Sequence, residues 1–558
     1  MIPTSSSKLS FELGALDPAW IVFEDESLLI VDKPEGVAAH AEDEGLADDL
    51  TSRVRAYLVG VEPAFHHRLD RETSGLVLIT KTEDARRELA RAFEQGEVRK
   101  RYIAGVRGVP RAPLNQGMLQ HHLSKRSRGV VRIVQPKHGK EALTRVSLLE
   151  ARGDRSLLSL EPLTGRTHQL RVQLAAIERP IAGDLLYGRD PAPRMLLHAS
   201  ELSFELGGER LRFRSDAPPS FERFLRGDDQ YRLGDEVELR AALAAAIRRR
   251  GALFQSKDTS AFRLFHRERD GIPELAIDFY DGALVVHLYE EEGARPELSA
   301  LLKVLAEYDP KAVFLKRRIS RGHQPIAHEE SELAPPEPLL GHADESPTSI
   351  LEGGVRYAID LSEGLSTGIF LDQRHSRALV RELSGGKRVL NLFSYTAPFT
   401  IAAIEGGASA TLSIDASKPA TRRAKESAAS RTESREHRFI AEDVFEILPR
   451  LARREERFDL VIVDPPTHAR TKRHRFNSGR DWVRLAGLCV PLIARGGALL
   501  ASTNDHRASH AEFDAALFEA VERSGRRLIE RRRVPLPLDF LPGAGAQAHL
   551  KVSLLKLD

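Results

Sequence analysis

Residues 459–467 read Asp-Leu-Val-Ile-Val-Asp-Pro-Pro-Thr, a short apolar run that stops at an acid and two prolines. A run of this length bounded by turn residues predicts a buried strand. Similar strand cores lie at residues 388–392, 410–414 and 498–501, with helical patterns between them. Strands that alternate with helices predict a doubly wound, Rossmann-like α/β domain, which we expect over residues 356–558.

The N-terminal part of the chain has a different pattern. Its short apolar runs, at residues 21–23, 28–31 and 76–79, are separated by turn residues, and long helical patterns are few. This arrangement predicts an α+β domain with a mixed, mainly antiparallel sheet over residues 1–225. Residues 215–235 are rich in proline, glycine and aspartate, which predicts a linker.

Between these two domains, over residues 226–355, we expect a linker helix and a small α+β subdomain. Residues 236–250 start with acids and end with arginines, as suits a helix dipole. Apolar runs at 283–289 and 312–315 predict strands. The polar stretch at 320–349 predicts a long loop.

Composition limits the class of protein. A chain of 558 residues is too long for one hydrophobic core, and 41% apolar with 29% charged residues is an ordinary globular balance. No apolar run approaches the roughly 20 residues that span a bilayer, and the first residues lack a signal-peptide pattern. The single cysteine, Cys489, excludes an internal disulfide and a cysteine-based zinc site. We expect a cytoplasmic protein without a membrane partner.

The net charge of +2 does not by itself indicate a nucleic-acid partner. Basic residues nevertheless gather at 99–101, 125–140, 248–250 and 470–475. Clustered Lys and Arg can follow a phosphate backbone, although any one cluster is more often a solvated face. Four clusters in one chain favour RNA as a partner.

Residues 66–76 read His-His-Arg-Leu-Asp-Arg-Glu-Thr-Ser-Gly-Leu and precede an apolar strand. By itself, Asp70 between two arginines would be a surface ion pair. Four other motifs accompany it in order along the chain: Lys33-Pro34-Glu35-Gly36, Lys100-Arg101-Tyr102-Ile103-Ala104, residues 165–172 (Gly-Arg-Thr-His-Gln-Leu-Arg-Val), and residues 180–184 with 196–199.

In identity and order these motifs resemble the RluA family of pseudouridine synthases, over roughly residues 18–225. The resemblance implies that Asp70 acts covalently in converting uridine to pseudouridine. It implies that Arg171 pairs with Asp70, that Tyr102 stacks on the base and assists proton removal, and that Arg68 fills the gap left by a flipped uridine. No cofactor or metal is implied for this half. About twenty residues precede the match, so we expect no separate N-terminal RNA-binding domain.

In the C-terminal part, acids follow successive predicted strands, at Asp415, Asp443 and Asp464. The carboxyl ends of parallel strands meet at one edge of an open sheet, where ligands bind. There, Asp415 can accept both ribose hydroxyls of a nucleoside and Asp443 its adenine amino group. Asp-Pro-Pro makes a rigid turn that can hold a planar base. Each acid alone would be a helix N-cap or loop residue.

With residues 364–374 and 389–396, this pattern resembles class I S-adenosylmethionine-dependent methyltransferases, especially those of bacterial large-subunit ribosomal RNA, over residues 236–558. At Ala397-Pro398 the chain lacks the glycine, usual in that family, that lets the backbone approach the cofactor. The resemblance implies S-adenosylmethionine as cofactor, held by Asn391, Phe393, Tyr395, Thr396, Asp415, Asp443 and Asp464.

The target atom can be narrowed by chemistry. Methylation of cytosine C5 needs a cysteine nucleophile, and Cys489 lies in an apolar run that predicts buried packing. The residues around Asp464 and Ser502-Thr503-Asn504 most resemble the guanine-N7 methyltransferase of 23S ribosomal RNA. N7 already carries a lone pair, so catalysis needs only positioning. We therefore expect substrate contacts from Pro465, Pro466, Thr467, Lys472 and Asn504.

The sequence thus predicts a bifunctional enzyme that acts on RNA, with 23S ribosomal RNA favoured and no metal required. Two alternatives stay open. The C-terminal half could methylate another RNA base, or tRNA. It could also be a catalytically inactive RNA clamp for the synthase, an alternative that Ala397-Pro398 supports.

Overall fold

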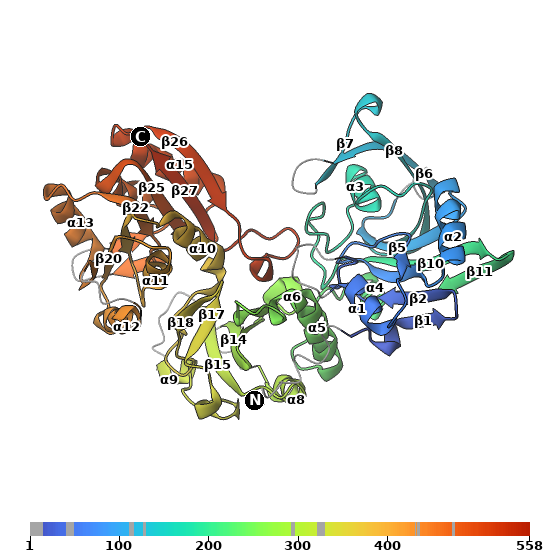
Figure 1. Ribbon diagram of the computed structural model, residues 1–558, viewed down its shortest axis with the longest axis horizontal. Coiled ribbons are helices and arrows are strands. Elements are labelled where there is room, and N and C mark those ends of the chain that lie inside the picture. Colours follow the sequence, from blue (N-terminus) through green and yellow to red (C-terminus); the bar gives the residue numbers. More distant parts are fainter. Residues whose placement is uncertain are drawn as a thin grey trace.

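The computed structural model describes residues 15–40, 49–110, 116–125, 130–291, 296–320, 330–429, 431, 436–470 and 475–558. The chain forms three regions, each built on its own sheet, which follow one another along the long axis of the molecule (Figure 1). We refer to them as the N-terminal region (15–226), the middle region (236–358) and the C-terminal region (371–558).

The N-terminal region is built on an 11-stranded sheet in the order β1-β2-β4-β10-β5-β9-β8-β6-β7, with β11 on β10 and β3 on β4. Among the described strands only β4 and β10 pair in parallel, so the expectation of a mixed, mainly antiparallel sheet is confirmed. The strands are β1 (Ile21–Glu24), β2 (Leu28–Lys33), β3 (Ala64–Phe65), β4 (Ser74–Thr80), β5 (Arg99–Arg107), β6 (Gln116–Lys125), β7 (Val131–Ile133), β8 (Lys140–Arg152), β9 (Arg155–Pro162), β10 (Leu197–Leu206) and β11 (Glu209–Arg214).

The helices of this region are α1 (Leu50–Tyr57), α2 (Glu83–Gln95), α3 (Gln169–Ala176) and α4 (Pro219–Arg226). Helix α4 corrects one expectation, because it lies inside the stretch 215–235 that was predicted to be a linker. Phe221 and Phe224 alternate with polar residues at helical spacing and are buried in the core of the N-terminal sheet. The chain leaves this region only after Gly227, whose φ of 91° ends the helix.

The middle region has a five-stranded sheet, β12-β13-β14-β15-β16, and a hairpin of β17 and β18. Helix α5 covers the predicted helical stretch and begins at Asp235, which caps it. Part of the predicted loop at 320–349 is ordered: α9 forms, and β16 pairs with β15, while residues 321–329 lie outside the described residues. The elements are α5 (Glu236–Arg249), α6 (Gly251–Phe254), β12 (Ala261–His266), α7 (Arg267–Asp270), β13 (Leu275–Tyr280), β14 (Ala283–Glu291), α8 (Ser299–Ala306), β15 (Ala312–Ser320), α9 (Glu330–Leu333), β16 (Leu340–Gly341), β17 (Ser349–Glu352) and β18 (Val355–Ala358).

The C-terminal region is a seven-stranded sheet in the order β21-β20-β19-β22-β25-β27-β26, parallel from β21 to β25. Its strands are β19 (Arg388–Leu392), β20 (Ala410–Asp415), β21 (His437–Ala441), β22 (Phe458–Val463), β25 (Ile493–Thr503), β26 (Leu528–Val534) and β27 (Lys551–Leu557), with a small hairpin of β23 (His468–Arg470) and β24 (Arg475–Asn477). The predicted α/β fold is confirmed; the antiparallel pair β26–β27 was not predicted.

Helices cover both faces of this sheet. The two apolar cores lie on opposite faces, one with side chains of α13, α14 and α15, the other with side chains of α10 and α11. Since the strand order reverses between β19 and β22, the loops after these strands diverge and leave a crevice at their carboxyl ends. The helices are α10 (Arg374–Leu383), α11 (Pro398–Glu405), α12 (Lys418–Ala429), α13 (Val444–Arg453), α14 (Trp482–Cys489) and α15 (His510–Arg523).

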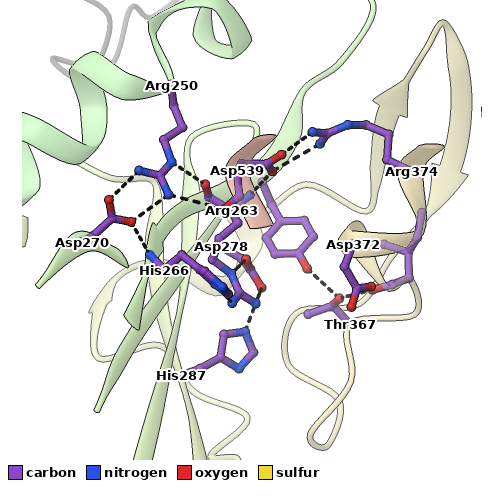
Figure 2. Close-up of polar contacts among 12 residues, drawn as sticks. Arg250, Arg263, His266, Asp270, Asp278, His287, Thr367, Asp372, Arg374 and Asp539 are labelled. Atoms are coloured by element: carbon purple, nitrogen blue, oxygen red, sulfur yellow. Dashed lines mark hydrogen bonds and ion pairs between the residues drawn. The ribbon is translucent and has the colours of Figure 1, made fainter. Parts of the chain in front are cut away.

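A buried polar cluster joins the middle region to the C-terminal region (Figure 2). The Arg263 guanidinium binds Asp278, and the Arg263 backbone N–H donates to Asp539 at 2.9 Å. Asp539 comes from the segment between β26 and β27 and also pairs with Arg374 at 2.5 Å. Because each buried charge has a partner, the two regions are held in one arrangement.

Candidate functional site

The larger of the two cavities that contain predicted site residues, of about 960 Å³, lies in the N-terminal region. It is bounded by the loop before β4, the end of α2, the start of β5 and the segment that leads into α3. The four residues predicted from the first motif set all line it: Arg68, Asp70, Tyr102 and Arg171. Residues far apart in the sequence are therefore brought together at one place.

Asp70 forms an ion pair with Arg171 at the bottom of this cavity. Arg171 Nη1 donates to Asp70 Oδ2 at 2.9 Å, while its Nε and Nη2 bind the two carboxylate oxygens of Asp184 at 2.7 and 2.8 Å. Burial acts to lower the pKa of Arg171, but Asp184 and Asp70 outweigh it and raise it above its ordinary value. A rigidly held guanidinium thus lies against the carboxylate of Asp70, which keeps 25% of its side chain exposed.

Three residues near Asp70 were not singled out from the sequence. Asp184 fixes Arg171, and His168 places its Nε2 atom 3.8 Å from Asp70 Oδ1. Burial lowers the pKa of His168, which favours the neutral ring beside the carboxylate. Its other ring nitrogen, Nδ1, lies 2.9 Å from the hydroxyl of Tyr187. Asp184 and His168 lie within motifs quoted in the sequence analysis, so those motifs could have pointed to them. Tyr187 lies in none of these motifs, and no sequence pattern pointed to it.

Tyr102 and Arg68 occupy different depths of the cavity. Tyr102 is nearly buried on β5, and burial together with the charge of Asp70 raises the pKa of its hydroxyl above the ordinary value. It therefore presents a neutral phenol and an aromatic face to the cavity at neutral pH. Arg68 is exposed at the rim, where its side chain can reach a bound polymer.

The second cavity, of about 420 Å³, lies at the carboxyl ends of the C-terminal strands, where the sequence placed a ligand site. It also includes residues that were not predicted, among them Asp372, Gln373 and Leu550. Eight predicted residues line it: Phe393, Tyr395, Asp415, Asp443, Asp464, Pro465, Pro466 and Asn504.

The other predicted residues lie away from this cavity or at its edge. The Asn391 side chain is buried in β19 and donates to Thr400, and Thr396 donates to the carbonyl of Gly368 at 2.5 Å. Neither residue lines the cavity, because strand and turn contacts hold both side chains. Thr467 donates to Asn504 Oδ1 at 2.5 Å. Lys472 lies outside the described residues.

The turn that follows β19 has left-handed backbone at three residues that are not glycine. Phe393, Tyr395 and Ala397 have φ of 55°, 51° and 63°. Such conformations cost about 1 kcal/mol or more each and gather at functional sites. The Tyr395 N–H donates to Asp415 Oδ2 at 2.8 Å, which holds the turn against the end of β20. Ala397 thus adopts the conformation usual for glycine, with its side chain fully buried outside the cavity lining.

The three strand-end acids differ in what holds them. Asp415 accepts from the backbone of Tyr395 and of Ser417, and Asp443 caps α13 through the Phe445 N–H at 2.9 Å. Asp464 accepts a hydrogen bond from the Ser502 hydroxyl at 2.5 Å and a further one from the Gln373 side chain. Burial raises the pKa of Asp464 to about 6, against the effect of those hydrogen bonds. Burial thus disfavours the charged form of Asp464, and a cation beside it would favour that form.

Cys489 is fully buried in α14 among the residues of the C-terminal core, as predicted. Burial raises the pKa of its thiol well above the ordinary value. Because it is the single cysteine of the chain, no thiol lines the second cavity. Across the described ranges, no three His, Cys, Asp or Glu side chains are grouped to hold a metal ion. Nor does that part of the chain contain a helix both long and apolar enough to cross a membrane.

Two family models match the chain. One, described as RNA pseudouridylate synthase, matches residues 27–176, and the other, described as S-adenosylmethionine-dependent methyltransferase, matches residues 262–555. The first match contains Asp70, Tyr102 and Arg171, and the second contains the whole lining of the second cavity. These matches confirm the expectation of two enzyme domains, with S-adenosylmethionine as the cofactor of the second.

Known proteins agree with the second match. The chain is 34% identical over 328 residues to a putative ribosomal RNA large subunit methyltransferase, YwbD, of Bacillus subtilis, covering 58% of this chain and 81% of that protein. It is 36% identical over 335 residues to a ribosomal RNA large subunit methyltransferase of Deinococcus radiodurans, covering 58% and 80%. A solved putative methyltransferase complexed with SAH shares the fold at 24% identity, with a TM-score of 0.50 over 64% of this chain and 87% of that one.

The titration of Asp464 predicts a pH effect on stability. An ordinary Asp ionises near pH 4, so a folded-state pKa of about 6 means that the folded protein holds this proton more tightly and loses stability as the pH rises. Between pH 5 and 8 we expect the wild type to lose about 1 to 1.5 kcal/mol relative to Asp464→Asn. Denaturant unfolding at the two pH values measures this difference. Asp459→Asn, at the opposite end of β22, is the control, and equal pH dependence in wild type and Asp464→Asn would contradict the assignment.

Proposed function

We propose, on the premise that this chain belongs to the S-adenosylmethionine-dependent methyltransferase family and carries an RNA pseudouridylate synthase domain, that it modifies large-subunit ribosomal RNA at a uridine and at a guanine. The relatives named for ribosomal RNA support the substrate, and such a substrate implies a cytoplasmic location. We divide the chain into a synthase domain (1–225), a linker helix with a small α+β subdomain (226–355) and a methyltransferase domain (356–558).

The synthase is of the RluA type in this proposal, and the observation that carries it is the Asp184–Arg171–Asp70 arrangement inside the larger cavity. The isomerisation breaks the C1′–N1 bond of uridine, forms a C1′–C5 bond and moves the C5 proton off the carbon. Asp70 acts as the covalent carboxylate, and Arg171 keeps it ionised and oriented. Tyr102 supplies the aromatic face against the base, and Arg68 at the rim occupies the space from which the uridine is flipped.

Asp70→Asn is expected to abolish pseudouridine formation, lowering kcat at least about a thousandfold, because an amide cannot replace the carboxylate as a nucleophile. The amide still accepts the Arg171 hydrogen bond, so the fold is retained. Pseudouridine is quantified in RNA incubated with purified protein, and methyl transfer by the same variant is the internal control. Full synthase activity in Asp70→Asn would exclude the assignment.

The second cavity fits the cofactor of the family. Phe393 and Phe445 provide apolar walls for a planar ring, and Asp415 lies at the end of the second strand, where it can accept ribose hydroxyls. Asp443 lines the same cavity at the start of α13, where its carboxylate can accept an amino group. Asp464 is the carboxyl that can balance a positive charge. When bound, S-adenosylmethionine supplies an electrophilic methyl group.

Calorimetry tests cofactor binding. We expect Asp415→Ala to weaken S-adenosylmethionine binding at least about tenfold, since hydrogen bonds to a charged group contribute roughly 1.5 to 3 kcal/mol. Asp70→Asn, which alters the other cavity, should bind the cofactor as the wild type does. If the wild type itself gives no heat with millimolar cofactor, the C-terminal half is the RNA clamp of the alternative reading.

Guanine N7 is the proposed methyl acceptor. The observation that supports this choice is the set of residues at the edge of the second cavity. This edge holds Pro465 and Asn504 and no thiol, which disfavours cytosine C5. The Thr467 hydroxyl donates to Asn504 Oδ1, so the Asn504 amide group is left as a donor. Guanine presents N7 and O6 as acceptors on one edge, which an amide donor can orient. Methylation of another base, or of tRNA, is the alternative.

Modification mapping decides the base. Ribosomal RNA from a strain lacking this chain should lose one 7-methylguanosine and at least one pseudouridine, and the wild-type gene should restore both. Asn504→Ala should restore pseudouridine but lower methylation about tenfold or more, because one base contact is lost. Loss of a methylated cytosine or adenine, with 7-methylguanosine unchanged, would overturn the choice of guanine.

A further inference from the structure

The end of helix α5 in the middle region lies directly on the Lys33–Gly36 turn of the N-terminal region. A Cβ atom built on Gly36, whose φ is +84°, would meet Arg249 Cγ at 3.0 Å and Arg248 Cβ at 3.3 Å. Arg248 Nε donates to the carbonyl of Glu35 at 3.2 Å, and the Arg249 guanidinium lies 3.8 Å from the Glu35 carboxylate. The N-terminal and middle regions are therefore in close contact at this turn, where a side chain at position 36 would meet Arg248 and Arg249.

The same turn holds the loop that carries Asp70. The Gly36 N–H donates to the carbonyl of Arg71 at 2.9 Å, and Lys33 Nζ donates to that carbonyl at 3.2 Å. Lys33 Nζ also donates to the carbonyl of Val37 at 2.8 Å, so its buried side chain fastens turn and loop together. The peptide next to Asp70 is thus fixed by a turn on which α5 rests.

A second contact reaches the loop from the short helix α7. Arg269 of α7 places Nη2 3.5 Å from Glu72 Oε1, two residues beyond Asp70, and the two side chains are 10% and 23% exposed. Burial acts to raise the pKa of Glu72, but Arg269 and Arg249 outweigh it and hold it below the ordinary value. A carboxylate this close to Asp70 stays ionised because arginines of the middle region face it.

Arg249 is in turn fixed within the middle region, together with its neighbour Arg250. Asp270, the last residue of α7, is fully buried and binds Arg249 Nη2 and Arg250 Nη2, each at 2.7 Å. Figure 2 shows the ion pair between Arg250 and Asp270, and the hydrogen bonds from Arg250 to Arg263 and Asp539. A side chain anchored in this way is pre-ordered and can impose its geometry on the loop that it faces.

We propose that Arg269 and Arg249 are positioning residues of the synthase, supplied by the middle region, and that they hold residues 70–73 in the productive geometry. The synthase domain is then not a self-sufficient module attached to a methyltransferase. Its active site is completed by residues from the part of the chain that the methyltransferase family match covers and from the helix that precedes it. The kinetic part of this proposal rests on the role assigned to Asp70 above.

The proposal is tested with variants of the full-length chain. Arg269→Gln should lower kcat for pseudouridine formation about tenfold, since small misplacements of a reacting group cost one to two orders of magnitude. KM for the RNA and the rate of methyl transfer should stay within about twofold, because neither RNA contacts nor the second cavity change. Arg269→Lys, which keeps a positive charge facing Glu72, should retain most of kcat.

Arg267→Gln is the matched control, because Arg267 is on the same helix but stacks on Tyr289 of the middle region. A kcat equal to the wild type in Arg269→Gln, or a kcat in Arg269→Lys no higher than in Arg269→Gln, would overturn the proposal. Hydrogen exchange of peptides covering residues 66–76 gives a readout that needs no activity: it should be faster in Arg269→Gln and unchanged in Arg267→Gln. Unchanged exchange in Arg269→Gln would also overturn the proposal. Faster exchange in a protein whose wild type forms no pseudouridine would uphold the contact and refute the proposed function of Asp70.

Discussion

The buried carboxylate of Asp270 is the contact on which the arrangement of the three regions depends. It binds Arg249 and Arg250 and accepts the His266 backbone N–H. Arg250 continues to the carbonyls of Arg263 and of Asp539, in the C-terminal region, and the Arg249 backbone lies on the turn of the N-terminal region. Removing one partner of a buried ion pair leaves an uncompensated charge and costs roughly 3 to 5 kcal/mol. The two arginines that bind Asp270 therefore contact residues of all three regions.

The segment between β26 and β27 strengthens this connection. A Cβ atom on Gly545 would lie 2.2 Å from the carbonyl oxygen of Arg189, so the segment touches the N-terminal region directly, as Figure 1 shows near the centre of the molecule. Its other end reaches the second cavity, where His549 binds Asp372 at 3.0 Å and Leu550 lines the wall. This segment therefore contacts both the N-terminal region and the second cavity.

The two cavities use carboxylates in opposite environments. Asp70, the proposed covalent carboxylate, faces a guanidinium that is itself held by a second acid. Asp464 has a hydroxyl as its hydrogen-bond donor, and burial raises its pKa to about 6. The first carboxylate faces a fixed guanidinium, whereas burial disfavours the charged form of the second. This difference matches an isomerase that needs no cofactor and a transferase whose cofactor is cationic.

The sequence by itself determined the α/β fold of the C-terminal region, because strand periodicity is a local property. The grouping of Asp70, Tyr102 and Arg171 was implied by the resemblance of their motifs to a known family. It also predicted Asp415, Asp443 and Asp464 at one sheet edge, since parallel strands align their carboxyl ends. Only the tertiary structure decided that Phe221 and Phe224 fold α4 onto the first core instead of leaving a linker, and that Asp184 holds Arg171. The pairing of Glu72 with Arg269 likewise depends on packing between residues nearly two hundred positions apart, which no local pattern encodes.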